Sequence, residues 1–343
     1  MRGDQNILTS APGKLVLLGE YAVLEGAPAL VMAVNRRARV TLTDNPDGDY
    51  VIDAPSLDIR NARGRLANDR INWPDLDAAD AEKLQLAGAV IAAQATEAPL
   101  PPFRASLDTD AFFTGPGGSK LGLGSSAALT VALAGAVRVL SRTPVPQAES
   151  LINIHRQVQD GRGSGLDIAA SLHGGVIEYR LDEGRPRIES LRLPAGLEVA
   201  CVWSGQSAST GAFLGRVAGW RERAPVDYAA LMEHLTSCAA AGASAARDDD
   251  AAAFMDTAQA YAAGLAELGR ASGAGIITPE HVKISSIAAD CGVTYKTCGA
   301  GGGDIGIAFA TDPDRLAFFR RQLAEAGFQA LDLMQDSRGL RAD

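Results

Sequence analysis

The sequence predicts an α/β chain, of the α+β kind, folded as two domains. Short apolar runs rich in β-branched residues alternate with longer stretches of helical spacing, which indicates a mixture of strands and helices. The length of 343 residues exceeds what a single hydrophobic core usually serves. A segment rich in charge, proline and glycine at residues 181–196 interrupts the pattern. We therefore expect one domain over residues 1–190 and a second over residues 191–343.

The first domain is expected to open with strands and to continue with helices. Apolar runs bounded by turn residues predict the strands, and stretches of helical spacing predict the helices. Pro12 and Gly13 are interpreted as a turn before the first strand, and Pro144 and Pro146 as the end of a long helix. The expected strands are residues 15–19, 29–34, 38–43, 49–54 and 103–110, and the expected helices are residues 80–97, 127–142 and 147–160.

The second domain is expected to carry long helices and a glycine turn between two strands. Because alanine is the best helix former, the alanine-rich tract at residues 226–270 predicts helices. The remaining expected elements are strands at residues 198–205, 293–299 and 304–310 and helices at residues 279–290 and 312–327.

The composition excludes several classes of protein. The net charge is -9 and the sequence pI is about 5.1, whereas nucleic-acid and anionic-membrane surfaces need clustered positive charge. The four cysteines show neither a CxxC pair nor zinc-ligand spacing. Residues 1–10 lack the apolar core of a signal peptide, and no apolar run is long enough to span a bilayer. We expect a soluble cytoplasmic protein that binds neither nucleic acid nor membrane.

A glycine-rich loop at residues 116–126 runs into a predicted helix. Glycines let the backbone approach a ligand closely, and a helix N-terminus presents free N–H groups and a positive dipole end, so a phosphate anion suits this position. Ser125 and Ser126 can cap the helix, ligate a metal, or both. The loop matches neither the Walker A nor the Rossmann pattern. A purely structural loop is the alternative interpretation.

A second glycine-rich segment lies at residues 299–309. A tight turn between two strands explains two of these glycines, but so many together cost conformational entropy. Gly301, Gly302 and Asp304 therefore indicate close approach to a substrate or to the first glycine loop.

Two charged residues stand in apolar surroundings. Asp167, within "GSGLDIAAS", needs either a charged partner or a helix N-terminus to cap. Lys14, at the expected change from loop to strand, is either a surface lysine or that partner. An aspartate and a lysine beside a phosphate loop suit phosphoryl transfer, because the carboxylate orients a hydroxyl or accepts its proton and the ammonium steadies charge on the phosphate.

Taken together and in order, these segments resemble the GHMP kinase superfamily, which includes galactokinases, homoserine kinases and mevalonate kinases. The resemblance covers nearly the whole chain. It implies an ATP-binding first domain similar to ribosomal protein S5 domain 2, a ferredoxin-like second domain, and an active site in the cleft between them. The motifs that carry it are "APGKLVLLGEYAVLEG", "GLGSSAA", "GSGLDIAAS" and "GAGGGDIGIAF".

Within the superfamily, the finer match is to phosphomevalonate kinases. Tyr21 stands where mevalonate kinases usually have histidine, and Arg156 stands where they have a magnesium-binding glutamate. The segments "VWSGQSAST" and "KTCGAGGGDIGIAF" are also similar to phosphomevalonate kinase motifs, with Cys298 in place of the usual serine. The match implies ATP-dependent phosphorylation of mevalonate 5-phosphate to the 5-diphosphate in isoprenoid biosynthesis.

The resemblance also implies roles for individual residues, with ATP and Mg²⁺ as cofactors. Lys14 and Asp167 are the expected catalytic residues, and Ser126 is the expected metal ligand. The residues expected to bind ATP are Lys120, Gly122, Leu123, Gly124, Ser125, Ser126 and Ala127. Those expected to bind the acceptor are Glu20, Tyr21, Ser164, Gly165, Ser209, Gly301, Gly302 and Asp304.

Other interpretations stay open at the level of the sequence. A mevalonate kinase or another small-alcohol kinase has the same fold, and a non-catalytic relative would bind ATP or a metabolite as a regulator. Arg36, Arg37 and Arg162 are candidates to hold the phosphate of the acceptor, although each is equally a solvated surface charge. A monomer and a homodimer are both compatible with the sequence.

Overall fold

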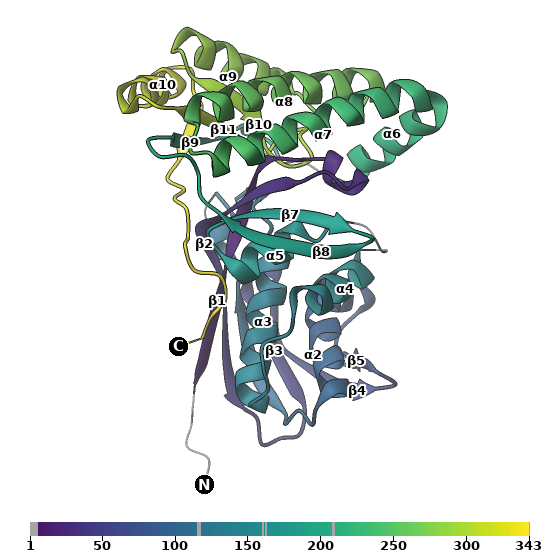
Figure 1. Cartoon of the computed structure of the whole chain (residues 1–343). Helices are drawn as coiled ribbons and strands as arrows, with labels where there is room; N and C mark the ends of the chain where they lie inside the picture. Colours follow the sequence, from purple (N-terminus) through teal and green to yellow (C-terminus); the bar gives the residue numbers. More distant parts are fainter. Residues whose placement is uncertain (1–5, 115–117, 160, 162, 208–209, 343) are drawn as a thin grey trace.

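The computed structural model describes residues 6–342 apart from residues 115–117, 160, 162 and 208–209. The chain forms two tiers, one above the other (Figure 1). The first half builds the lower tier around a large sheet, and the second half builds the upper tier around a smaller one. No helix within the described residues is both long and apolar enough to cross a membrane.

Within the described residues the lower sheet has nine strands, nearly all of them antiparallel to their neighbours. They are β1 (Ile7–Leu18), β2 (Ala29–Asp44), β3 (Tyr50–Ala54), β4 (Ile59–Ala67), β5 (Arg70–Asn72), β6 (Phe103–Asp108), β7 (Val176–Asp182), β8 (Arg185–Leu191) and β13 (Arg341–Ala342). The order is β13-β1-β2-β6-β3-β4-β5, with β7 beside β2 and β8 beside β7. Only the β3–β6 pair of this sheet is parallel.

Both faces of the central strands are buried, which explains why β2 reads as a continuous apolar run. Ala29 and Val31 face a core shared with the helices of the lower tier. Leu30 and Met32 alternate with them and belong to a second core shared with helices of the upper tier. The lower helices are α1 (Ala78–Lys83), α2 (Gln85–Glu97), α3 (Ser125–Ser141), α4 (Ala148–Val158) and α5 (Leu166–His173), with short 3₁₀ turns η1 (Ala22–Glu25), η2 (Pro55–Leu57) and η3 (Asp110–Phe112).

The upper sheet is antiparallel in the order β10-β11-β9-β12. Its strands are β9 (Glu198–Trp203), β10 (Thr294–Thr297), β11 (Ile305–Ala310) and β12 (Gln329–Leu331). Cys201 of β9 faces the core shared with the lower tier, whereas its neighbours Ala200 and Val202 face a separate core on the other side. The helices of this tier are α6 (Thr210–Arg223), α7 (Pro225–Arg247), α8 (Ala251–Ser272), α9 (Pro279–Asp290) and α10 (Pro313–Glu325).

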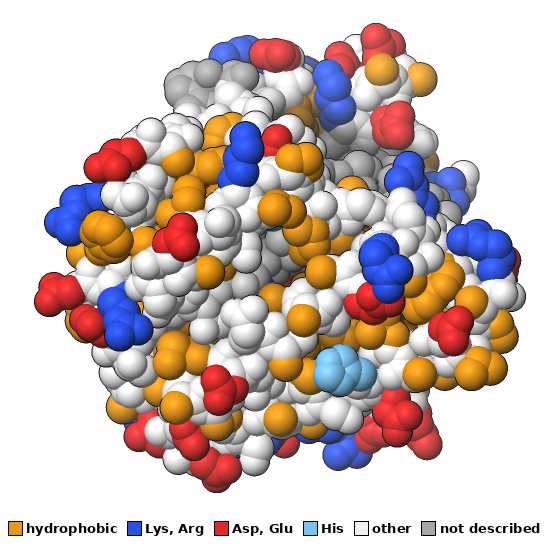
Figure 2. Space-filling model, turned by 90° about the horizontal axis from the view of Figure 1, so that it is seen from above, with side chains coloured by type: hydrophobic (Ala, Val, Ile, Leu, Met, Phe, Trp, Pro, Cys, Tyr) orange, Lys and Arg blue, Asp and Glu red, His pale blue; other side chains and the backbone are white. Residues whose placement is uncertain are grey.

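Viewed from above the upper tier, the molecule shows acidic and basic side chains interspersed with apolar ones (Figure 2). The described residues on this face form no extended patch of a single charge.

The structure confirms the mixed α/β fold, but one expectation about its elements is wrong and two features were not expected. Strand β1 runs through Pro12 and Gly13 instead of beginning after them, with a shift of register between the two residues. The charged break near residue 181 is largely the hairpin of β7 and β8, whose two-residue turn at Glu183 and Gly184 has positive φ at both positions. Helix α6 follows the "VWSGQSAST" segment and was not expected.

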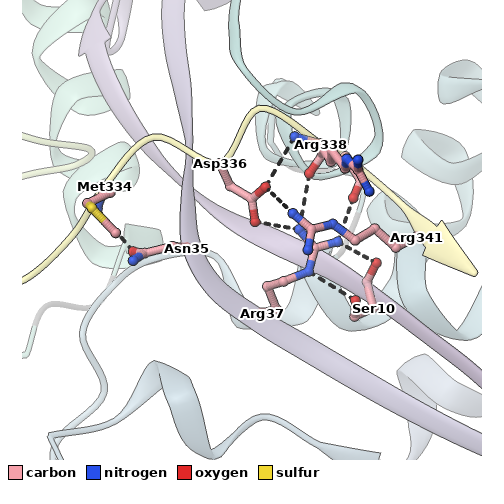
Figure 3. Close-up of polar contacts among 8 residues, drawn as sticks. Ser10, Asn35, Arg37, Met334, Asp336, Arg338 and Arg341 are labelled. Carbon is pink, nitrogen blue, oxygen red and sulfur yellow. Dashed lines mark hydrogen bonds and ion pairs between the residues drawn. The ribbon is translucent and has the colours of Figure 1, made fainter. Parts of the chain in front are cut away.

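The end of the chain returns from the upper tier to the lower sheet, where β13 pairs with β1 (Figures 1 and 3). The proposed division at residue 190 falls at the end of β8, but this C-terminal segment lies outside the upper tier. Arg37 and Asp336 hold the segment with a buried ion pair of 2.5 Å. Arg37 also donates to both oxygens of Ser10 and to the backbone carbonyls of Arg338 and Gly339.

Candidate active site

A cavity of about 340 Å³ lies where the two tiers meet. Its lower wall comes from β1, the N-terminal ends of α3 and α5, and the C-terminal end of α4. Its upper wall comes from the glycine loop between β10 and β11 and from α6. The expected site residues that line it are Lys14, Glu20, Tyr21, Lys120, Gly122, Gly124, Ser126, Ser164, Gly165, Asp167 and Asp304.

Lys14 is carried by the middle of β1 rather than by the edge of a strand, so its expected position at a loop–strand transition is wrong. Its backbone N–H donates to the carbonyl of Leu123 at 2.9 Å, which ties β1 to the first glycine loop. A side chain at Gly13 would lie 2.8 Å from that same carbonyl and 2.7 Å from the ring of Phe112. Glycine at position 13 therefore allows the strand and the loop to approach closely.

Gly124, with φ 77, caps the N-terminus of α3. No serine side chain accepts a hydrogen bond there, so the expected capping role of Ser125 and Ser126 is wrong. The hydroxyl of Ser126 instead lies 3.1 Å from Nε2 of His155. Because the first turn of a helix has N–H groups without intrahelical partners, the cavity receives the positive end of α3.

Asp167 lies in the first turn of α5, whose N-cap is Gly165, so the alternative that Asp167 caps this helix is wrong. Its Oδ1 accepts a hydrogen bond of 3.0 Å from the backbone N–H of Ile168. A Cβ atom at Gly124 would be 3.3 Å from Cε of Lys14 and 3.7 Å from Cβ of Asp167. Lys14 and Asp167 therefore meet beside Gly124, next to the position that a side chain would occupy there. Both side chains line the cavity, and no ion pair within 4.0 Å joins them in the described structure.

Lys120 brings a second ammonium to the cavity. Its side chain reaches solvent, but partial burial lowers its pKa. The carboxylate of Asp304 opposes this shift, and the positive charge of Lys14 adds to it. Lys14 and Lys120 together form a cationic region beside the N-terminus of α3, as an anionic phosphate requires.

Glu20 and Tyr21 lie at the end of β1 and contact the upper tier. The carboxylate of Glu20 pairs with Lys296 at 2.5 Å, and both side chains are almost fully buried. Burial raises the pKa of Glu20, and the charge of Lys296 acts against that rise. The hydroxyl of Tyr21 donates to the backbone carbonyl of Ala300 at 2.6 Å.

Two of the expected glycines face away from the cavity. A side chain at Gly301 would meet the backbone of Ile276 at 2.5 Å, and one at Gly302 would meet the ring of Phe213 at 1.9 Å. The loop residues that line the cavity are Gly299, Ala300 and Asp304. The cavity lining also lacks three residues that were expected to bind ATP, namely Leu123, Ser125 and Ala127. Leu123 is buried in the core that the two tiers share.

Of the candidate arginines, Arg36 and Arg37 do not line the cavity. Every N–H group of the Arg37 guanidinium faces an acceptor of Ser10 or of the C-terminal segment, so Arg37 does not bind the acceptor phosphate. Arg162 and Ser209, together with residues 116–117 of the first glycine loop, lie outside the described residues.

Three functional candidates were not recognised in the sequence. His155 reaches Ser126 from the buried face of α4, and nothing in its local sequence signals this contact. Arg156 lines the cavity and donates to the carbonyls of Gly163 and Ser164. The sequence could have revealed Lys296, because a lysine within a buried strand needs a partner for its charge.

Among the described residues, no group of three or more histidine, cysteine, aspartate or glutamate side chains is arranged to hold a metal ion. A divalent cation at this site would therefore take most of its ligands from phosphate oxygens and water, as Mg²⁺ does at nucleotides.

Comparisons with known proteins show matches in both sequence and fold. Residues 86–175 match the family described as "GHMP kinases N terminal domain". The phosphomevalonate kinase of Streptomyces sp. (strain CL190) is 30% identical over 98% of this chain and 99% of its own length. The mevalonate kinase of Thermococcus gammatolerans is 29% identical over 64% of each chain. The crystal structure of Streptococcus pneumoniae phosphomevalonate kinase in complex with phosphomevalonate and AMPPNP shares the fold, with a TM-score of 0.77 at 19% identity over 96% of this chain and 99% of its own.

Proposed function

The chain belongs to the GHMP kinase family, and we propose that it is an ATP-dependent kinase that phosphorylates mevalonate 5-phosphate to mevalonate 5-diphosphate. The placement of Lys14 and Asp167 together beside Gly124, at the N-terminus of α3 and in the lining of the cavity, carries the proposal. The choice of acceptor is supported by the Streptomyces phosphomevalonate kinase, which is similar over 98% of the chain, whereas the Thermococcus mevalonate kinase is similar over 64%.

In this proposal the phosphates of the nucleotide bind at the N-terminus of α3. Gly122 and Gly124 both have positive φ and line the cavity, and their lack of side chains lets Asp304 and Lys14 pack closely against this wall. Lys120 supplies a positive charge at the same wall.

Mg²⁺ fits this site as a partner of the phosphates. The hydroxyl of Ser126 lines the cavity beside His155, and Asp167 offers a carboxylate nearby. Oxygen donors of this kind suit Mg²⁺, which would neutralise charge on the phosphates when bound. Ser126 and Asp167 are the residues that would hold it.

The transfer itself needs little covalent chemistry from the protein. An anionic oxygen of the acceptor phosphate forms a bond to the γ-phosphorus of ATP while the bond to the β–γ bridging oxygen breaks, and ADP leaves. Lys14 lowers the repulsion between the two anions and holds them in line. Asp167 orients the acceptor. Because the nucleophile is already an anion, Asp167 has no proton to remove, in contrast to a kinase that acts on an alcohol.

An ADP-release assay with mevalonate 5-phosphate, mevalonate, galactose and homoserine tests the proposal. We expect mevalonate 5-phosphate to give a kcat/KM at least about tenfold above that of any other acceptor, a difference of about 1.4 kcal/mol in transition-state stabilisation. A higher value with mevalonate would make the protein a mevalonate kinase. Binding of ATP without ADP release from any acceptor would instead support a regulatory relative.

A further inference from the structure

The turn that ends β1 has an unusual backbone. Tyr21 has φ 61 and ψ -53, and the backbone N–H of Ala22 donates to the carbonyl of Glu20 at 2.6 Å. This is a γ-turn with positive φ at its centre, the rarer and strained of the two forms, and a residue with a side chain adopts it at a cost. Strain of this kind persists only where the surrounding structure holds the backbone in place.

Three contacts from the upper tier hold this turn. Nζ of Lys296, on β10, lies 2.5 Å from Oε1 of Glu20. The hydroxyl of Tyr261, on α8, donates to the carbonyl of Glu20 at 2.6 Å. The hydroxyl of Tyr21 donates to the carbonyl of Ala300 at 2.6 Å. The lower and upper tiers are therefore joined at the turn, which forms part of the cavity wall.

The ion pair is isolated from water. The side chain of Lys296 is 0% exposed and that of Glu20 is 2% exposed. Lys296 also donates to the carbonyl of Thr297 at 2.6 Å, so its ammonium is anchored to its own strand. A charge buried to this extent is tolerated only with a partner, and removal of one partner leaves the other uncompensated.

Lys296 does not line the cavity, whereas Glu20 and Tyr21 do. We propose that Lys296 is a positioning residue of the transfer reaction: through its ion pair with Glu20 it fixes the strained turn at Tyr21 and thereby the wall that the acceptor contacts. The inference rests on the proposed function, since it assumes an acceptor that binds beside Glu20 and Tyr21. The phosphate-binding wall at Gly122 and Gly124 belongs to the lower tier, and none of the three contacts that hold the turn involves either glycine.

The experiment compares two variants that each remove one charge from a buried ion pair. Lys296→Met leaves Glu20 without its partner, and Asp336→Asn, the matched control, weakens the Arg37–Asp336 pair, which is similarly buried but lies away from the cavity. Both should lower the Tm. At a temperature where both are folded by circular dichroism, only Lys296→Met should raise the KM for the acceptor by about tenfold or more, with the KM for ATP changed less than about threefold.

A double variant separates positioning from stability. Glu20→Gln combined with Lys296→Met removes both charges, so the Tm should return towards that of the wild type. The KM for the acceptor should nevertheless stay raised, because nothing then ties the turn to β10. Recovery of the KM together with the Tm would overturn the inference, as would an unchanged KM in Lys296→Met.

The acceptor in these measurements is the one that the wild type uses best in the ADP-release assay. A wild type that prefers another acceptor would refute the proposed substrate while the role of Lys296 is still measured. A wild type that releases ADP with none of the acceptors would refute the proposed function and the inference together.

Discussion

Replacement of Gly124 by alanine tests the proposed phosphate-binding wall directly. Gly124 has φ 77, where a residue with a Cβ is strained by about 1 kcal/mol. The added methyl group would lie 3.3 Å from Cε and 3.4 Å from Cγ of Lys14. Contacts this tight require the lysine side chain to give way by a few tenths of an ångström. The substitution therefore perturbs both the N-terminus of α3 and the position of the ammonium.

The expected effect on catalysis exceeds the effect of strain alone. A displacement of about 1 Å at a reacting group can cost about a hundredfold in rate, so a shift of a few tenths should lower kcat by about tenfold, or about 1.4 kcal/mol. Gly273→Ala is the matched control, because Gly273 also has a positive φ, 68, caps the end of α8 and has nothing within 4 Å of an added Cβ. Both variants should lose similar stability.

Steady-state ADP release gives kcat, and isothermal titration calorimetry with ATP gives the dissociation constant. We expect Gly124→Ala to lower kcat and weaken ATP binding, while Gly273→Ala keeps both close to the wild type. A folded Gly124→Ala variant with the kcat and ATP affinity of the control would refute the placement of the phosphates beside Gly124 and Lys14.

The remaining predictions concern charge. Lys14→Ala should lower kcat by a factor on the order of 10² to 10⁴, the loss typical of a positioned electrostatic group, and near-normal turnover would make Lys14 an ordinary surface lysine. Asp167→Asn should lower kcat less than Lys14→Ala if the acceptor is already a phosphate, and comparably if Asp167 removes a proton from a hydroxyl. His281, hydrogen-bonded to Gly303 and Tyr295, has a pKa lowered by burial from its ordinary 6.5. At acidic pH the unfolded chain therefore binds more protons at His281 than the folded chain does. The free energy of unfolding should be fully present above about pH 6.5 and should decrease as the pH falls below it. The decrease in Tm from about pH 7 to pH 5 should be smaller in His281→Gln, and an equal decrease would contradict this assignment.

The sequence was informative wherever a local rule decides the structure. Helical spacing and alanine content predicted α3 and α7 to α10 closely, because each helix is set by its own residues and its buried face. The glycines at 122 and 124 predicted a close backbone approach, and both have the positive φ that favours glycine. The order of four motifs along the chain pointed to the family that the comparisons establish.

Local rules failed where a distant segment decides the structure. Pro12 and Gly13 have the composition of a turn, but β2 pairs with β1 on both sides of them, and the bulge between them absorbs the mismatch. Ser125 and Ser126 have the composition of helix caps, but Gly124 takes that position, and Ser126 lies beside His155 of another helix.

The sequence by itself therefore determined the class of the fold, the family and the residue types at the proposed phosphate-binding wall. The tertiary structure alone decided which charges meet. Lys14 and Asp167, far apart in the chain, meet beside the same glycine, whereas Glu20 pairs with Lys296 on a strand of the other tier. A sequence pattern reports the surroundings of each residue along the chain, but the partner of a buried charge is set by the packing of two sheets, and no local period encodes that contact.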